Sequence, residues 1–226
     1  MKKKFLILAL VLVTVFAFTG CKSAKDKQAA LDFKKEYESV NGKEAKMGHV
    51  HRTIKIDEDN PYVKVKPKKI IEMFDKKETF YLYIGDSYCP WCRSVVEKSV
   101  EVAKANKIKK IYYIDIWDDD WNEILRDKYE LKDGKPVKTL DGTKEYERIL
   151  KEANDFLRDY VLEDENGNEV QVGEKRTYAP TYLYIKDGKV VKGTNGQSDK
   201  QEDKFGELTD EILKDEEKKF NEFFKN

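Results

Sequence analysis

Two apolar runs stand out in the middle of the chain. Residues 79–84 (TFYLYI) and 109–116 (KKIYYIDI) are rich in β-branched, aromatic and aliphatic side chains. Such runs are typical of strands covered on both faces of a sheet. Between them, apolar and small residues recur every three or four positions over residues 95–103. This spacing indicates a helix with one buried face, so the segment is predicted to form a strand–helix–strand unit.

Further elements are predicted on both sides of this unit. Pro67 stands at a favourable first helical position and opens a helix with apolar residues at helical spacing. Residues 62–65 alternate and predict an edge strand. Residues 181–191 (TYLYIKDGKVV) surround an Asp-Gly turn and predict a hairpin. Residues 208–224 carry the spacing of a final amphipathic helix.

A polar segment, residues 118–178, separates the strand–helix–strand unit from the predicted hairpin. It has apolar residues at helical spacing, namely Tyr146, Ile149, Leu150, Ala153, Phe156, Leu157, Tyr160 and Val161. We therefore predict a mostly helical insertion. The pair Asn166-Gly167 predicts a hairpin turn, and the acidic triplet at 118–120 predicts the start of a helix.

The N-terminus has the pattern of an export signal. Three lysines are followed by an unbroken apolar run over residues 5–18 and by small residues before Cys21. This predicts a signal peptide at 1–20. The ending resembles a bacterial lipoprotein box, with Phe18 in place of the usual leucine, which implies a lipid on Cys21. We expect a lysine-rich tether at 21–48, a domain at 49–226 and a location on the extracytoplasmic face of the cell membrane. Ordinary secretion and an uncleaved anchor are the alternatives.

The charge of the chain is balanced. It has 44 basic and 44 acidic residues, intermixed along its 226 positions. Balanced charge produces no basic field of the kind that attracts nucleic acid, so no nucleic-acid partner is expected. The length that remains after signal cleavage suits one domain with an insertion.

The cysteines carry the candidate chemistry. With Cys21 lipidated, only Cys89 and Cys92 remain, in the stretch CPWC at the start of the predicted helix. An exported pair is free to cycle or to stay oxidised. A helix N-terminus offers unpaired N–H groups and about half a positive charge, which favours a thiolate. Cys89 is placed to receive this help, and Cys92 lies one turn further on. Pro90 loses no helical hydrogen bond there.

This order of features resembles the thioredoxin-like superfamily. The residues that carry the resemblance are 79–92 (TFYLYIGDSYCPWC), 113–117 (YIDIW) and 178–191 (YAPTYLYIKDGKVV). The CPWC pair and the Ala-Pro-Thr step before the hairpin are two separate matches. The lipoprotein box, Asp86 and the long insertion look most similar to Gram-positive thioredoxin-like lipoproteins and bacteriocin-transport accessory proteins.

The resemblance implies an α/β fold with a central mixed sheet flanked by helices and an insertion before a cis-proline. It implies a thiol-disulfide oxidoreductase without a cofactor, acting on thiols or disulfides of exported proteins, with a redox partner in the membrane as a further candidate. The implied site residues are the nucleophile Cys89, the resolving thiol Cys92 and the substrate-contacting Pro90, Trp91, Ala179 and Pro180, with Pro180 as the cis-proline.

The chain departs from the thioredoxin pattern in two places. Six residues before the first cysteine, where thioredoxins have a buried aspartate that handles a proton, this chain has Tyr83. A tyrosine is not a base near neutral pH, so Asp86, Glu97 or a water chain is expected in that role. No histidine lies between the cysteines, which favours an intermediate redox potential and leaves the direction of exchange open. Arg93 is expected either to add charge beside the thiolate or to lie at the surface.

Other interpretations of these motifs stay open. The CPWC pair with His49 and His51 has the residue types of a zinc site, although alternate residues on a strand point to opposite faces, and surface histidines are expected. The acidic runs 117–121 and 164–169 do not have EF-hand spacing. The alternative function is a non-catalytic accessory module for protein or bacteriocin export, with the cysteine pair locked as a disulfide.

Overall fold

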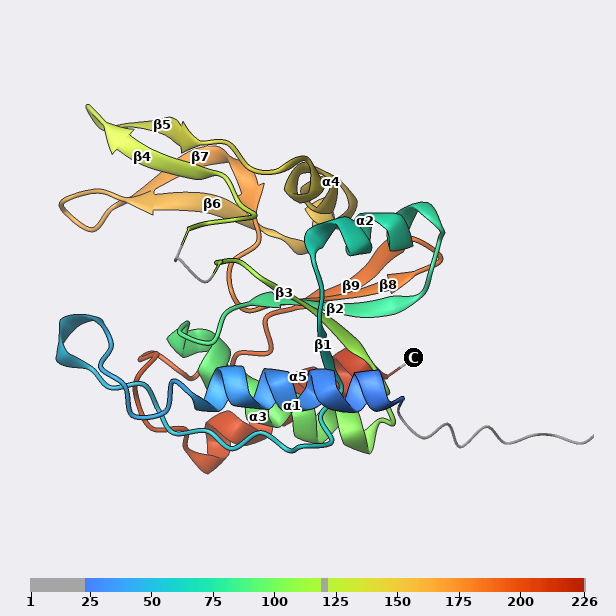
Figure 1. Ribbon diagram of the computed structural model, residues 1–226. Coiled ribbons are helices and arrows are strands. Elements are labelled where there is room, and N and C mark those ends of the chain that lie inside the picture. Colours follow the sequence, from blue (N-terminus) through green and yellow to red (C-terminus); the bar gives the residue numbers. More distant parts are fainter. Residues whose placement is uncertain (1–22, 119–121, 226) are drawn as a thin grey trace, which may run out of the picture.

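A mixed five-stranded sheet forms the centre of the protein (Figure 1). The computed structural model describes residues 23–118 and 122–225. The strands are β1 (Tyr62–Lys64), β2 (Phe80–Gly85), β3 (Ile111–Asp115), β8 (Thr181–Lys186) and β9 (Lys189–Thr194), in the spatial order β1-β3-β2-β8-β9. The first three run parallel, whereas β8 and β9 are antiparallel to their neighbours. The predicted strands, hairpin and α/β class are confirmed.

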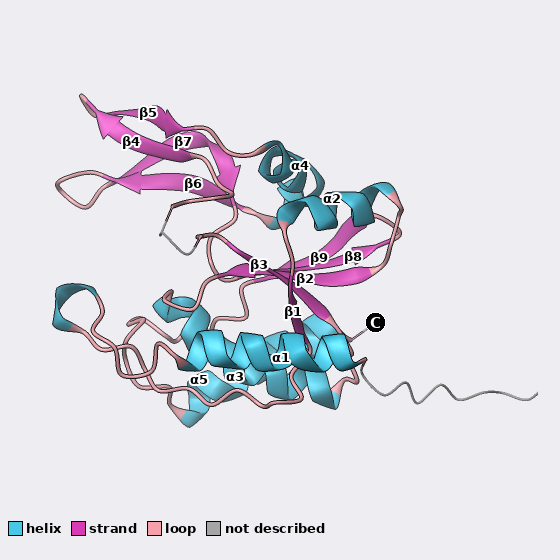
Figure 2. Cartoon of the chain, in the orientation of Figure 1, coloured by secondary structure: helices cyan, strands magenta, loops and turns pink. Residues whose placement is uncertain are grey.

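Helices cover both faces of this sheet (Figure 2). One face carries α1 (Ala24–Glu38), α3 (Pro90–Ala105) and α5 (Asp210–Phe224), and the other carries α2 (Pro67–Asp75) and α4 (Lys144–Ala153). Pro67 occupies the first turn of α2, and the Thr209 side chain caps α5 by accepting a hydrogen bond from the backbone N–H of Ile212. The helices predicted from sequence around residues 67–74, 95–103 and 208–224 are confirmed.

The two faces of the sheet differ in chemistry. Successive side chains of a strand point to opposite faces, so the FYLYIG sequence of β2 places tyrosines on one side and aliphatic residues on the other. The face toward α1, α3 and α5 is lined by Tyr62, Tyr81, Tyr83, Tyr113 and Tyr182. The face toward α2 and α4 is lined by Leu82, Ile84, Ile114, Leu183 and Ile185. A buried hydroxyl needs a partner, and Tyr83 finds one in the Tyr37 hydroxyl, 2.7 Å away.

The N-terminal segment does not act as a tether over residues 24–38. These residues form helix α1, whose Phe33 and Tyr37 are 1% and 0% exposed in the core. The ring of Phe33 stacks on Tyr62 with centroids 4.2 Å apart. Ala30, Phe33 and Tyr37 recur at three and four residues, and this narrow stripe is sufficient to dock a lysine-rich helix. The predicted signal peptide at 1–20 and the lipidation site Cys21 lie outside the described residues.

The insertion contains more strand than helix, so the prediction of a mostly helical insertion is wrong. It contains the hairpins β4 (Lys128–Lys132) with β5 (Lys135–Leu140) and β6 (Arg158–Glu163) with β7 (Glu169–Arg176), next to α4 and the short η2 (Asn154–Phe156). The helix predicted from the apolar spacing ends at Ala153. The apolar residues that follow lie in or next to η2 and in β6, where strand pairing outweighs the local helical spacing.

Turn residues mark both hairpins of the insertion. Asp133 and Gly134 have positive φ angles of 50° and 72°, as a two-residue hairpin turn requires. Gly167 has φ 79° in the β6–β7 turn, which confirms the turn predicted at Asn166-Gly167. In the acidic triplet, Asp119 and Asp120 lie outside the described residues. Residues 122–127 are not helical, so the predicted helix does not continue into the described residues that follow the triplet.

Replacing Phe33 with alanine is expected to destabilise the protein by about 3–5 kcal/mol, because it leaves a cavity between α1 and the sheet. The measurement is urea unfolding followed by tryptophan fluorescence. Leu31→Ala, on the exposed side of the same helix with 40% of its surface accessible, is the control and is expected to cost less than about 1 kcal/mol. Equal midpoints for the two variants would show that α1 does not belong to the folded domain.

Candidate active site

The two cysteines meet at the start of α3. Strand β2 ends at Gly85, and the turn that follows places Cys89 as the N-cap of the helix. The Cys89 Sγ accepts a hydrogen bond from the backbone N–H of Cys92 at 3.4 Å. Cys89 is partly exposed, Cys92 is 0% exposed, and both are free thiols. One sulfur is therefore presented to solvent while the second lies directly behind it.

The second predicted motif lies against the first. The Ala179–Pro180 peptide bond is cis, as predicted. The carbonyl oxygen of Ala179 accepts a hydrogen bond from the Cys89 Sγ at 3.4 Å, although the two residues are 90 positions apart in sequence. Trp91 and Ala179 line one cleft of about 360 Å³. The structure thus brings together the six site residues expected from sequence: Cys89, Pro90, Trp91, Cys92, Ala179 and Pro180.

The insertion borders this cleft. Arg158 at the start of β6 and Tyr178 after β7 line it opposite Trp91. The Arg158 guanidinium lies over the Tyr178 ring, 4.8 Å from its centroid. A wall of the cleft beside the cysteine pair is therefore built by the segment that separates β3 from β8.

Cys92 lies in a fully buried environment. Burial raises its pKa well above the ordinary value, the neighbouring Cys89 and the charge of Asp86 raise it further, and a hydrogen bond from Tyr83 acts in the opposite direction. Tyr83 itself has a strongly raised pKa because it is buried, so it stays neutral and acts only as a hydrogen-bonding group. A Cβ on Gly85 would lie 2.3 Å from the Tyr83 hydroxyl oxygen. Glycine therefore makes room for this hydroxyl beside Cys92.

Asp86 is a buried carboxylate in the same turn. Its Oδ1 accepts hydrogen bonds from the backbone N–H groups of Tyr88 and Cys89, both at 2.8 Å. The side chain is 6% exposed, and burial raises its pKa to about 6 in spite of these two bonds. By contrast, Glu97, the other carboxylate considered from sequence, is half-buried and accepts from the backbone N–H of Lys55, and burial raises its pKa as well. Only Asp86 of the two acts on the Cys92 pKa through its charge. Asp86 is therefore the better placed of the two to exchange a proton near Cys92.

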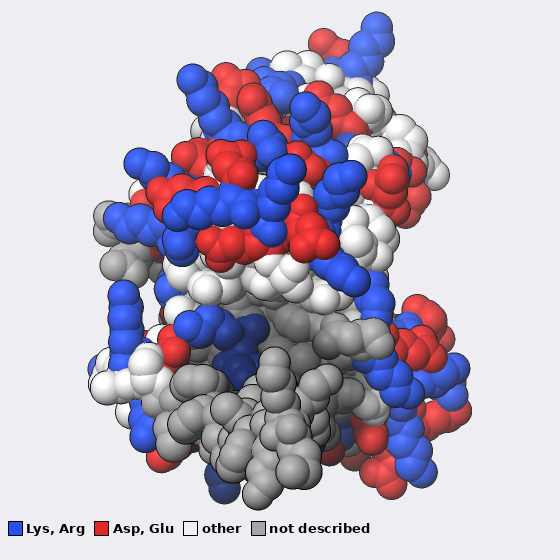
Figure 3. Space-filling view, turned by 90° about the vertical axis from the view of Figure 1, so that its right-hand side faces the viewer, with Lys and Arg blue, Asp and Glu red and all other residues white. Residues whose placement is uncertain are grey.

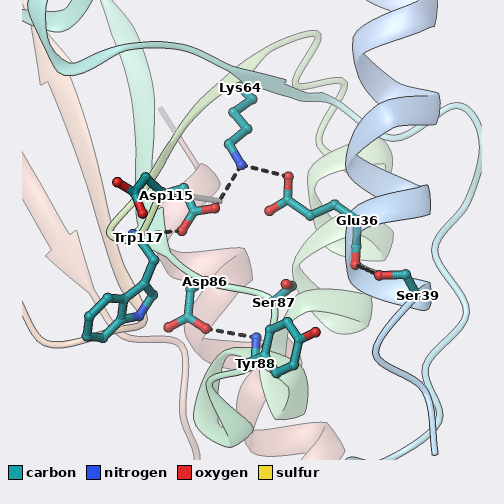
Figure 4. A pocket seen from close by; sticks show the side chains of 9 residues that line it. Glu36, Ser39, Lys64, Asp86, Ser87, Tyr88, Asp115 and Trp117 are labelled. Carbon is teal, nitrogen blue, oxygen red and sulfur yellow. Dashed lines mark hydrogen bonds and ion pairs between the residues drawn. The ribbon is translucent and has the colours of Figure 1, made fainter. Parts of the chain in front are cut away.

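A polar pocket lies beside Asp86. It measures about 280 Å³ and is lined by residues of α1, β1, β3 and the active-site turn (Figure 4). Lys64 bridges the carboxylates of Glu36 at 2.9 Å and Asp115 at 2.7 Å, while Trp117 lies on the far side of Asp86. The pocket has the polar lining and the volume needed to hold water next to the Asp86 carboxyl.

Arg93 has a role that neither sequence expectation described. It is 0% exposed, and its two terminal nitrogens donate to the carbonyl oxygens of Tyr37, Ser87 and Arg52 and to the side-chain oxygen of Asn41. Burial lowers the pKa of this guanidinium. The expectation of a surface residue is wrong, whereas the expectation of a positive charge beside the thiolate stays a prediction. Nothing in the sequence around Arg93 indicates that three carbonyl oxygens and one amide oxygen surround its side chain.

The two histidines lie beside the active-site turn. His49 stacks on Phe205 with ring centroids 4.3 Å apart, and His51 meets Tyr88 edge-on at 5.5 Å. The expectation of a surface position is wrong for His51, which is 6% exposed. Within residues 23–118 and 122–225, no group of three or more His, Cys, Asp or Glu side chains is placed to hold a metal ion. In the run 164–169, Asp164 accepts from the backbone N–H groups of Asn166 and Asn168 and closes the hairpin turn.

Comparisons with known proteins do not assign this chain to a family. Neither protein-family models nor curated protein sequences gave a match to this chain. Acidic and basic side chains are intermixed over the described surface that Figure 3 displays. In the described part of the chain, no helix combines the length and the hydropathy needed to cross a membrane. The function of the protein is therefore inferred from the geometry around Cys89.

Asp86→Asn is expected to change how stability depends on pH. Because burial raises the Asp86 pKa from 3.8 to about 6, the wild type has this contribution in full below pH 4 and loses it as the pH rises through 6. The loss corresponds to about 3 kcal/mol. Asparagine keeps an oxygen for the two backbone N–H groups and has no such titration. The free energy of urea unfolding should therefore fall in the wild type relative to D86N between pH 4 and 6.5, and parallel profiles would contradict the raised pKa.

Proposed function

We propose that this protein is a thioredoxin-like thiol-disulfide oxidoreductase, lipid-anchored on the outer face of the cell membrane, that exchanges disulfides with exported proteins. The observation that carries the proposal is the position of Cys89. Its sulfur caps α3, accepts the Cys92 N–H at 3.4 Å and lies 3.4 Å from the Ala179 carbonyl oxygen. A partly exposed sulfur with a second cysteine behind it provides the attacking and the resolving thiol of disulfide exchange.

The arrangement of elements supports a thioredoxin-like fold. Helix α3 follows β2 directly from the cysteine pair, β3 returns parallel to β2, and the cis-proline precedes the antiparallel β8–β9 hairpin. Helix α5 then packs beside α3 on the same face of the sheet. The insertion enters between β3 and β8 and leaves this order unchanged.

The exchange proceeds in two balanced steps. The Cys89 thiolate attacks one sulfur of a substrate disulfide, the substrate S–S bond breaks, and its electron pair leaves on the other substrate sulfur. Cys92 then loses its proton and attacks the Cys89 sulfur, which releases the second substrate thiolate. The substrate has gained two electrons, and the Cys89–Cys92 pair holds the new disulfide. The reverse sequence oxidises a substrate dithiol, and a thiol or disulfide partner on the same side of the membrane resets the pair.

Asp86 is the proposed acceptor for the Cys92 proton. Its charge raises the Cys92 pKa, so the two groups interact, and a carboxyl with a pKa of about 6 is a stronger base than an ordinary aspartate. The Tyr83 hydroxyl, held by Tyr37 at 2.7 Å, donates to the developing Cys92 thiolate and stabilises it. Asp86 and Tyr83 together thereby take the proton-handling role that a buried aspartate has in thioredoxins.

The proposed location rests on residues 1–21. Their lysines, apolar run and lipoprotein box are the features of an exported protein that keeps a lipid anchor. A disulfide cycle is compatible with that compartment. The partners proposed are therefore thiols or disulfides of exported proteins and a redox protein of the membrane.

Cys92→Ser is expected to accumulate a mixed disulfide between Cys89 and a substrate, because the sulfur that resolves it is missing. Cys89→Ser is expected to lower exchange with oxidised glutathione at least about 100-fold and to trap nothing. The measurements are thiol alkylation with gel shift and the rate of glutathione release. An accessory module with a locked disulfide would instead bind its export partner equally well with either serine variant and show no exchange in the wild type.

A further inference from the structure

An apolar groove opens directly beside Pro90. It measures about 710 Å³. Its apolar and aromatic walls, which we call the Phe205 groove, are formed by Ala45, Met47, His49, Tyr88, Pro90 and Phe205. Pro90 and Tyr88 flank Cys89 in sequence, so the groove and the reactive sulfur share one turn.

Both walls of the groove are fixed by hydrogen bonds. On one side, residues 43–51 fold back on themselves through bonds from Ala45 N–H to the His49 carbonyl at 2.8 Å and from His51 N–H to the Lys43 carbonyl at 2.9 Å. On the other side, Arg52 donates to the carbonyl of Gly206 at 2.7 Å and holds the segment that carries Phe205. A groove with fixed walls binds without a large cost of ordering.

The groove surface favours a large apolar side chain. The stacked rings of His49 and Phe205 offer a flat face, and Met47 is 95% exposed at the tip of the loop. An exposed methionine is an adaptable apolar contact. An apolar side chain left in water at this place has no packing function within the described chain, whereas it would stabilise a bound segment.

The charges around the groove define the rest of the ligand. Lys46 and Lys204 line it, and Lys43 approaches the Tyr88 hydroxyl at 3.3 Å. Glu44 is the acidic residue among the groove's lining residues. Among the lining residues, two lysines against one glutamate leave an excess of one positive charge, which favours an acidic group on the ligand.

In the proposed disulfide exchange, the molecule that reaches the groove is the substrate bonded to Cys89. A substrate bonded to Cys89 as a mixed disulfide must lay its chain over the neighbouring walls, and an extended chain advances about 3.3 Å per residue. We propose that the Phe205 groove binds the substrate segment next to the reacting cysteine. It selects segments that place an aromatic or large aliphatic side chain, followed by an acidic residue, within about three residues of that cysteine. This inference rests on the proposed function and adds the substrate class to it.

The test compares peptide disulfides on the purified full-length protein. Two peptides differ only in carrying phenylalanine or serine two residues from the cysteine, each followed by aspartate. Oxidised glutathione, which has no large apolar side chain, serves as the substrate that does not depend on the apolar walls of the groove. The wild type is expected to prefer the phenylalanine peptide about tenfold in kcat/KM, equal to about 1.4 kcal/mol. The double variant M47S/F205S should lose that preference and keep its rate with oxidised glutathione.

Leu140→Ser is the matched control, because Leu140 is 41% exposed on β5, in the insertion, and does not line the groove. It should keep the preference in full. The proposal is overturned if the wild type exchanges both peptides at the same rate, or if M47S/F205S retains the preference. Replacing the aspartate of the peptide by lysine should lower kcat/KM in low salt, and an unchanged rate would remove the acidic part of the proposal.

A failure of the proposed function gives a different result. In that case the wild type exchanges none of the three substrates, and the groove is judged by calorimetric binding of the same peptides with serine in place of cysteine. Tighter binding of the phenylalanine peptide that disappears in M47S/F205S supports the groove. Equal binding of both peptides overturns it.

Discussion

The geometry of the site depends on one buried cation, Arg93. A buried guanidinium is costly unless its donors are paired. Here three carbonyl oxygens and one amide oxygen accept hydrogen bonds from its two terminal nitrogens, while its Nε has no hydrogen-bond partner among the described residues. These acceptors belong to the end of α1, the segment from 41 to 52 and the active-site turn at Ser87. One side chain in the first turn of α3 therefore ties together the N-terminal helix, the loop that forms the Phe205 groove and the turn that presents Cys89.

The chemistry of the site follows from the two different faces of the sheet. Aliphatic residues face α2 and α4, whereas the opposite face carries tyrosines. The hydroxyls of Tyr62, Tyr83 and Tyr182 pair with other tyrosines or with Ser99, and that of Tyr113 donates to the Glu36 carboxylate. Cys92 lies in that tyrosine-lined layer, so its thiol is shielded from solvent yet close to the Tyr83 hydroxyl. Asp86 sits at the edge of the same layer, beside a polar pocket. In the proposed exchange, the neutral Tyr83 hydroxyl and the Asp86 carboxyl with its raised pKa would handle the proton that the buried Cys92 thiol releases.

The parts predicted from sequence are those that local pattern determines. Continuous apolar runs predicted β2 and β3, turn residues predicted the hairpin at Asp187-Gly188, and the cysteine pair predicted the start of α3. The side-by-side position of Cys89 and Ala179 came from the resemblance to thioredoxins, because nothing in local spacing links residues 90 positions apart.

The errors arose where tertiary structure outweighs composition. The lysine content of α1 concealed a stripe of three residues that docks it on the sheet. In the insertion, the helical spacing continued into η2 and β6 by coincidence. The Asp133-Gly134 turn, which joins β4 and β5, was a sequence signal for strands that the prediction did not use. The cage around Arg93 draws on carbonyl groups of three separate segments. Backbone acceptors leave no trace in the side-chain sequence, so that role becomes visible only in the folded chain.

The central claim is that Cys89 and Cys92 form a reversible redox pair. The most direct measurement is equilibration of the purified protein in glutathione buffers of graded ratio, with quenching by acid and counting of free thiols through alkylation and gel shift. The account predicts a single two-electron transition that is reached from both the oxidised and the reduced side and is absent in Cys89→Ser. A pair that keeps the same thiol count across the whole range of buffers would contradict it.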